Sequence, residues 1–390
     1  MDAGQDAEAR GTPLDALLDI FRVKQYFGVA LELRSWARAA RADLGFVDVV
    51  RRAALPLPAF LPATALPHAP PGRPLPRRVR RHPHPRLAGR RVAVVSSGGS
   101  GALATLIGLA RALDEAHASV CCWSLCSGGA LFGFPLAAGL PADRVADFVL
   151  GLTARDLVDL DWPAVARAPF RLGRGLTGLV RGERVERTYR DLLGDLTLGE
   201  LPVPAYVPIW NAEHNRLEYL GPRTHPDVTV ARAVRMGLSL PPVFEPVALD
   251  GQLWCDGGIV DILPVHPVLD LEAPPDVALA VNVFHPPGLA GEDATGWDRM
   301  PLSILELAAQ VRTSQHVQLA RENLARLRAE VPDVLLLEPV PYDVAQGTGL
   351  YRQFVDPTDW PTFIREGYDT TREALAAWHP ARALRAGSAW

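Results

Sequence analysis

Short apolar segments alternate with small-residue loops and amphipathic helices in the first half of the chain, and this alternation restricts its possible folds. Residues 92–95 are typical of a buried strand, and a loop of small residues follows at 96–101. Helical periodicity covers residues 103–115, a second buried strand is predicted at 120–125, and another helix is predicted from Gly129. Strands that alternate with helices form parallel sheets covered on both faces. We therefore predict an α/β domain with three layers (α/β/α) and a mainly parallel sheet.

The rest of the chain continues this pattern. Further strands are predicted at residues 206–210, 217–220, 277–283 and 334–337, and further helices at 228–238, 304–329 and 360–378. We assign residues 91–380 to one domain. The mostly helical stretch 143–198 and the N-terminal helices are expected to line its substrate pocket.

Two different segments precede this domain. Residues 1–55 carry leucine and aromatic residues at helical spacing, which predicts a helical extension packed on the domain, with a helix lying on a membrane surface as the alternative. Residues 56–90 are a predicted linker, because their many prolines prevent regular structure.

The end of the linker is strongly basic. Residues 73–91 contain no acidic residue, and their arginines stand at positions 73, 77, 78, 80, 81, 86, 90 and 91. A solvated, extended segment is the simplest interpretation, and a peripheral contact with anionic lipid headgroups or an acidic carrier protein is the alternative. The net charge of -4 and the lack of interleaved aromatic residues argue against nucleic-acid binding.

Cysteine usage and the first residues bear on the compartment. Cys121, Cys122 and Cys126 lie on an apolar segment without histidines at ligand spacing, and Cys255 is distant in sequence, so we expect reduced thiols and no zinc site. The polar, acidic start lacks the pattern of a secretory signal, and no apolar run approaches the ~18 residues of a membrane span. We expect a cytoplasmic protein, with peripheral membrane association as the alternative.

Ser127 stands where the second strand turns into a helix, a position that exposes a serine hydroxyl for nucleophilic attack. Such a turn requires small residues two positions to either side. Gly129 meets this requirement, but Leu125 does not. A serine that merely caps the helix is the simpler alternative, and Cys126 is a rival nucleophile.

Backbone amides near Ser127 could stabilise a developing oxyanion. The Gly128 amide opens the helix after Ser127, where unpaired amides and the helix dipole favour negative charge. The loop after the first strand offers a second set of amides at Gly98, Gly99 and Ser100.

Asp256 is the candidate base for Ser127. It stands at a predicted strand end before Gly257 and Gly258, which allow close approach of another backbone segment. An ordinary Asp-Gly turn is the simpler alternative. Among the histidines, His285 is the best rival, because it follows the strand predicted at 277–283.

Taken in order, these motifs resemble the patatin-like phospholipases over residues 91–378. The similar motifs are the glycine-rich loop 98–101, the serine turn 127–130 and the aspartate turn 256–258, together with segments 233–247, 260–265 and 367–372. The chain departs from the family pattern at Ser100, Ala102, Leu103, Leu125 and Gly237.

The resemblance implies a patatin-like fold and a lipid acyl hydrolase, that is, a phospholipase or esterase. Ser127 would be the nucleophile and Asp256 the base, the amides of Gly98, Gly99, Ser100 and Gly128 would form the oxyanion hole, and no metal or organic cofactor would be needed. An acyltransferase or thioesterase acting on carrier-bound acyl groups is one alternative. A lipid-binding protein with an attenuated site is the other.

Overall fold

The computed structural model describes residues 84, 86–160, 177–241, 243–284, 304–341, 344, 353 and 356–379, without the side chains of 304–313. The predicted extension 1–55 and nearly all of the linker 56–90 lie outside these residues, as does His285.

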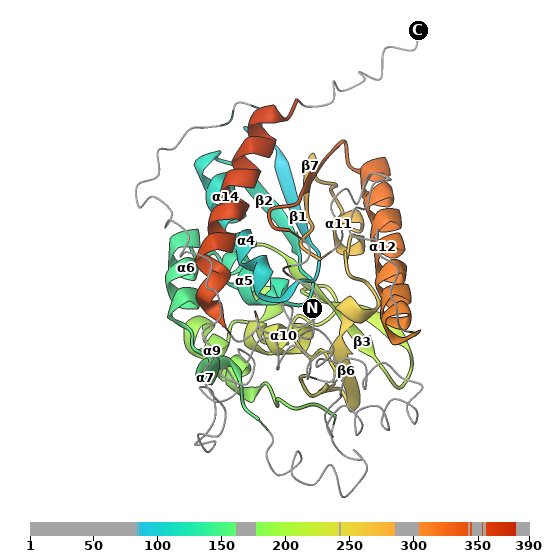
Figure 1. Ribbon diagram of the computed structural model, residues 1–390. Coiled ribbons are helices and arrows are strands. Elements are labelled where there is room, and N and C mark those ends of the chain that lie inside the picture. The colour runs from blue at the N-terminus through green and yellow to red at the C-terminus, as the bar shows by residue number, and fades with distance from the viewer. Residues whose placement is uncertain are drawn as a thin grey trace, which may run out of the picture.

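One eight-stranded sheet forms the centre of the described part of the chain (Figure 1). Its order is β5-β6-β3-β2-β1-β7-β8, with β4 paired to β3. Strands β3, β2, β1, β7 and β8 are parallel neighbours, whereas β4, β5 and β6 pair antiparallel. The strands are β1 (Arg91–Ser96), β2 (Ser119–Ser124), β3 (Ala205–Asn211), β4 (Arg216–Leu220), β5 (Val247–Leu249), β6 (Gln252–Asp256), β7 (Val277–Val281) and β8 (Asp333–Leu337). The mainly parallel sheet is confirmed.

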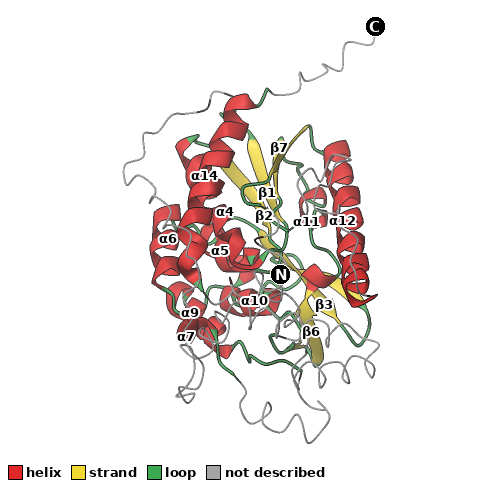
Figure 2. Cartoon of the chain, in the orientation of Figure 1, coloured by secondary structure: helices red, strands yellow, loops and turns green. Residues whose placement is uncertain are grey.

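Helices cover both faces of this sheet (Figure 2). Helices α4 and α14 pack together on one face, with α5 and α6 beside them, and α12 lies on the other. The helices are α4 (Thr105–Glu115), α5 (Gly129–Ala137), α6 (Ala142–Gly151), α7 (Ala154–Leu157), α9 (Glu183–Leu193), α10 (Val230–Gly237), α11 (His266–Leu269), α12 (Ile304–Glu330) and α14 (Trp360–Ala377). Among these described helices, none combines the length and apolar character needed to cross a bilayer.

Alternation along the central strand β1 builds the three layers. Val92 and Val94 pack into the core on the side of α4 and α5, whereas Ala93 and Val95 pack into the core on the side of α12. This is the period of two that a strand buried on both faces requires. The α/β/α prediction is therefore confirmed.

The strand predicted at 277–283 ends earlier than its apolar sequence suggests. β7 stops at Val281, and the next residues turn toward the loop that follows β1. The Val283 amide donates to Ser97 Oγ at 3.1 Å, and its side chain lies directly over Gly99, where an added Cβ would be 2.2 Å from Val283 Cγ2. Val283 thus covers the glycine-rich loop instead of extending the sheet.

The last arginines of the basic segment make contacts within the domain. Arg86 donates to the backbone oxygen of Trp378, Arg90 lies over the Trp378 ring at 5.6 Å, and Arg91 opens β1. Arg90 also lies 3.8 Å from Asp333. These contacts attach the start of the domain to the end of α14. The other arginines of segment 73–91 lie outside the described residues.

Candidate active site

Ser127 lies at the sharp turn between β2 and α5, at the carboxyl edge of the parallel strands. Its φ of 51° falls in the left-handed region, which costs a residue with a side chain on the order of 1 kcal/mol. Hydrogen bonds from the backbone amides of the two residues before Ser127 hold the turn in this strained conformation. The Leu125 amide donates to Tyr206 O on β3 at 2.8 Å, and the Cys126 amide donates to Ser96 Oγ at 3.3 Å.

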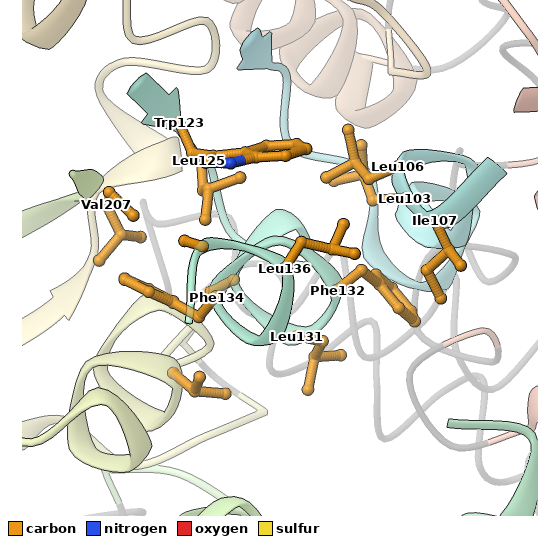
Figure 3. Close-up of a cluster of buried hydrophobic side chains, with 14 of the residues drawn as sticks. Leu103, Leu106, Ile107, Trp123, Leu125, Leu131, Phe132, Phe134, Leu136 and Val207 are labelled. Carbon is orange, nitrogen blue, oxygen red and sulfur yellow. The ribbon is translucent and has the colours of Figure 1, made fainter. Parts of the chain in front are cut away.

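Leu125 occupies the position where the sequence motif calls for a glycine, and Gly133 provides the space for it. The Leu125 side chain is fully buried and points toward α5 (Figure 3). A Cβ added to Gly133 would lie 2.3 Å from Leu125 Cδ2. The turn therefore tolerates a large residue at position 125, because the facing residue on α5 is a glycine.

Asp256 ends β6 beside Ile209 of β3. Its amide donates to Ser239 O at 2.9 Å, and its Oδ1 accepts the Gly258 amide at 2.8 Å. Gly257 is needed for close approach, because a Cβ there would lie 2.5 Å from the Pro208 carbonyl carbon. The turn therefore packs directly on β3, and the Gly258 amide fixes the Oδ1 atom of the Asp256 carboxylate.

Burial raises the pKa of the Asp256 carboxyl to about 7, although the nearby Ser127 hydroxyl and the Gly258 amide lower it. The structure therefore brings Ser127 and Asp256 together. Among the described residues, Asp256 Oδ2 has no hydrogen-bond partner, so the serine hydroxyl lies near the carboxylate without an aligned hydrogen bond to it. Catalytic hydrogen bonds in ligand-free sites are often loose in this way.

Cys126 is the rival nucleophile that stands next to Ser127 in the sequence. Its side chain is fully buried, whereas Ser127 is 6% exposed. The thiol donates to Asp261 O at 3.7 Å, and burial, with the Asp256 and Asp261 carboxylates, raises the pKa of the thiol well above its usual value. A buried thiol of this kind is a poor source of thiolate.

The glycine-rich loop packs directly on the serine turn. A Cβ on Gly128 would lie 2.2 Å from Ser100 O, so the two backbones touch. The Gly98 amide, which the sequence suggested as an oxyanion donor, instead donates to Ile262 O at 3.0 Å. Gly98 is better explained by space, because a Cβ there would lie 2.6 Å from Ile262 Cδ1.

Sequence reasoning missed a polar cluster behind the aspartate turn. Asp261 is 3% exposed, and its carboxylate accepts Tyr219 Oη at 2.6 Å and Asn323 Nδ2 at 2.9 Å. His316 bonds Ile259 O at 2.8 Å. His316 and Asn323 stand two helical turns apart on α12, so polar residues repeating on one apolar helix face were the available signal. The described residues contain no cluster suited to a metal ion.

Comparisons with known proteins show what this chain is similar to. The model of the family "Patatin-like phospholipase" matches residues 93–269, a range that contains Ser127, Asp256 and the loop between β1 and α4. Residues 93–269 are a divergent patatin-like phospholipase domain.

Two curated relatives match part of this chain. An uncharacterized NTE family protein of Mycobacterium tuberculosis is 29% identical over 207 residues, which are 53% of this chain and 51% of the relative. Lysophospholipase nte1 of Emericella nidulans is 29% identical over 210 residues, 51% of this chain and 12% of the relative. The match therefore spans about half the length of the first of these relatives.

Among solved structures, VipD from Legionella pneumophila is similar with a TM-score of 0.43 and 17% identity, covering 74% of this chain and 67% of that one.

Proposed function

We propose that this protein is a serine hydrolase that cleaves the acyl esters of lipids. The observation that supports this best is the approach of two buried groups. Ser127 stands at a strained strand-to-helix turn, beside a carboxyl whose pKa of about 7 suits a base that works near neutral pH. The match of residues 93–269 to the patatin-like phospholipase model and the lysophospholipase among the relatives support a lipid ester as the substrate class.

In the proposed reaction, the Asp256 carboxylate takes the proton of the Ser127 hydroxyl while Ser127 Oγ bonds to the ester carbonyl carbon. The carbonyl electrons move onto oxygen and form an oxyanion. When this intermediate collapses, the ester C–O bond breaks and protonated Asp256 returns its proton to the leaving alcohol. Asp256 then takes a proton from a water molecule as its oxygen bonds to the acyl carbon, which forms a second oxyanion. When this intermediate collapses, the bond from the acyl carbon to Ser127 Oγ breaks, protonated Asp256 returns its proton to Ser127 Oγ, and the fatty acid is released.

The oxyanion hole in this proposal consists of the amides of Gly99, Ser100 and Gly128. Gly98 is left out because its amide is bonded to Ile262 O. Amides fixed in this way favour the transition state because they need no reorganisation when the charge develops.

Neither alternative gains a specific observation. An attenuated site was suggested by the departures at Ser100, Ala102 and Leu125, and of these Leu125 is accommodated by Gly133. Docking of an acyl carrier was suggested by the basic segment, but Arg86 and Arg90 of that segment contact Trp378 instead.

The test is labelling and turnover with matched variants. A fluorophosphonate probe should label the wild-type protein at Ser127, and the protein should release p-nitrophenol from short p-nitrophenyl esters and fatty acid from phospholipid vesicles. Ser127→Ala should abolish labelling and lower turnover by on the order of 10⁴-fold or more. Cys126→Ala, next to it, should still be labelled at Ser127. Undiminished turnover in Ser127→Ala would exclude Ser127 as the nucleophile.

A further inference from the structure

Ser100 holds a hydroxyl in an unfavourable environment. Its φ is 56°, in the left-handed region that favours glycine, and the residue is fully buried. Its Oγ has no hydrogen-bond partner among the described residues. Burial of an unpaired hydroxyl and a strained backbone both oppose folding, and glycine at this position would avoid both.

The hydroxyl stands beside the proposed nucleophile. A Cβ on Gly128, the residue after Ser127, would lie 2.7 Å from Ser100 Cα and 2.2 Å from Ser100 O. The Oγ is two bonds from that Cα, so it lies within a few ångströms of the serine turn. The same loop reaches Ser127 at Gly98, where a Cβ would lie 3.6 Å from Ser127 Cβ.

The oxyanion hole lacks one of the amides that the loop could have supplied. The Gly98 amide is bonded to Ile262 O at 3.0 Å, so the loop has one fewer free donor. An unpaired hydroxyl on the same loop can supply a hydrogen bond of the same kind, because Ser Oγ–H is a donor that rotates to suit its acceptor.

We infer that the Ser100 hydroxyl is a catalytic hydrogen-bond donor to the oxyanion, acting beside the amides of Gly99, Ser100 and Gly128. This inference rests on the proposed function, since the oxyanion forms only during attack by Ser127. Ser100 keeps its proton throughout. Its Oγ–H bonds to the carbonyl oxygen as negative charge develops there and is released when the acyl-enzyme forms. A buried donor without a partner before the reaction gains its hydrogen bond in the transition state, which lowers the barrier rather than KM.

Two substitutions separate the hydroxyl from the backbone amide. Ser100→Ala and Ser100→Gly both keep the amide and remove the hydroxyl, and Ser100→Gly also relieves the positive φ. Both should lower kcat by ~10- to 100-fold on a short p-nitrophenyl ester, with KM within about twofold. The rate of fluorophosphonate labelling should fall in parallel, because the phosphonyl oxygen occupies the same position.

The matched control is Thr105→Val. Thr105 Oγ1 is also buried without a partner among the described residues, but it lies on the first turn of α4. Its loss should leave kcat unchanged. Ser100→Gly should unfold at the same or a higher temperature than wild type, so lost activity in that variant cannot come from misfolding.

The outcomes are distinguishable. If Ser127→Ala is inactive while Ser100→Ala and Ser100→Gly keep the wild-type kcat, the inference about Ser100 is wrong and the proposed function stands. If Ser127→Ala remains fully active, the proposed function fails and the inference fails with it.

Discussion

At the scale of the residue, the fold buries the carboxyl group of Asp256 away from water, which makes its ionised form less favourable. Asp256 is 1% exposed, and its Oδ1 accepts a single backbone amide. Burial disfavours the charged form of the group, which raises the pKa to about 7. The carboxyl is then half ionised near neutral pH. A pKa near the working pH suits a general base, because the group is ionised often enough to act and basic enough to accept the serine proton.

The pH dependence of the proposed reaction follows directly. Asp256 acts as a base only when it is ionised, so kcat/KM should fall below a pH of about 7, tenfold per pH unit.

The matched variant Asp256→Asn should be inactive, yet its free energy of unfolding at pH 8 should be higher than that of the wild type. The folded-state pKa is raised, so ionisation destabilises the wild-type fold above that pKa, and the difference should shrink as the pH falls from about 7 toward about 4. A flat rate profile between pH 5 and 8 would contradict this assignment.

At the scale of the element, the junction of β2 and α5 depends on two residues of complementary size. Leu125 directly follows β2 and Gly133 lies within α5, where an added Cβ would also be 2.7 Å from Leu125 Cδ1. The helix N-terminus can therefore approach the strand end closely although the residue before the turn is large. This contact fixes the direction in which α5 leaves Ser127.

A double-mutant cycle tests this pairing. Leu125→Ala should cost about 2–5 kcal/mol of unfolding free energy by leaving a cavity, and Gly133→Ala about 1–3 kcal/mol by overpacking. The double variant should be more stable than the sum predicts by about 1 kcal/mol or more, measured by denaturant unfolding. Leu125→Ala combined with Gly151→Ala should be additive, because a Cβ at Gly151 meets no atom within 4 Å. Additivity in the first pair would refute the complementarity.

The same junction shows what the sequence could and could not reveal. The strands and helices beside Ser127 were predictable because strand, turn and helix are coded locally. The tolerance of Leu125 was not, because Gly133 lies eight positions away and matters only through packing. The bond from Gly98 to Ile262 was hidden for the same reason. For the bonds from Asp261 and Ile259 to α12, the spacing of His316 and Asn323 was a signal, but it did not identify the partners of these two side chains.

At the scale of the whole molecule, the last described helix, α14, packs against the first crossover helix, α4. Helices α4 and α14 touch through their backbones at two glycines. A Cβ on Gly108 would lie 1.9 Å from Ile364 O, and a Cβ on Gly367 would lie 2.1 Å from Thr105 O. The end of α14 also holds the start of the domain, since His84 Nε2 bonds Leu375 O at 3.1 Å. Segments nearly the full domain apart in sequence thus form one packed layer.

This contact predicts that replacing these glycines by alanine lowers stability, the opposite of its usual effect in a helix. In an open helix, replacing glycine by alanine stabilises by up to about 1 kcal/mol. Gly108→Ala and Gly367→Ala should instead destabilise by about 1–3 kcal/mol each, because the added methyl group meets a backbone that can move only with its helix. Gly151→Ala, at the end of α6 with open space around it, should be neutral or slightly stabilising in the same thermal unfolding assay. Because α4 follows the loop that carries Ser100, separation of the two helices should also lower kcat. If the alanine variants instead matched Gly151→Ala in stability, the two helices would not be in backbone contact. The packing of α14 on α4 would then not be what holds the glycine-rich loop in place.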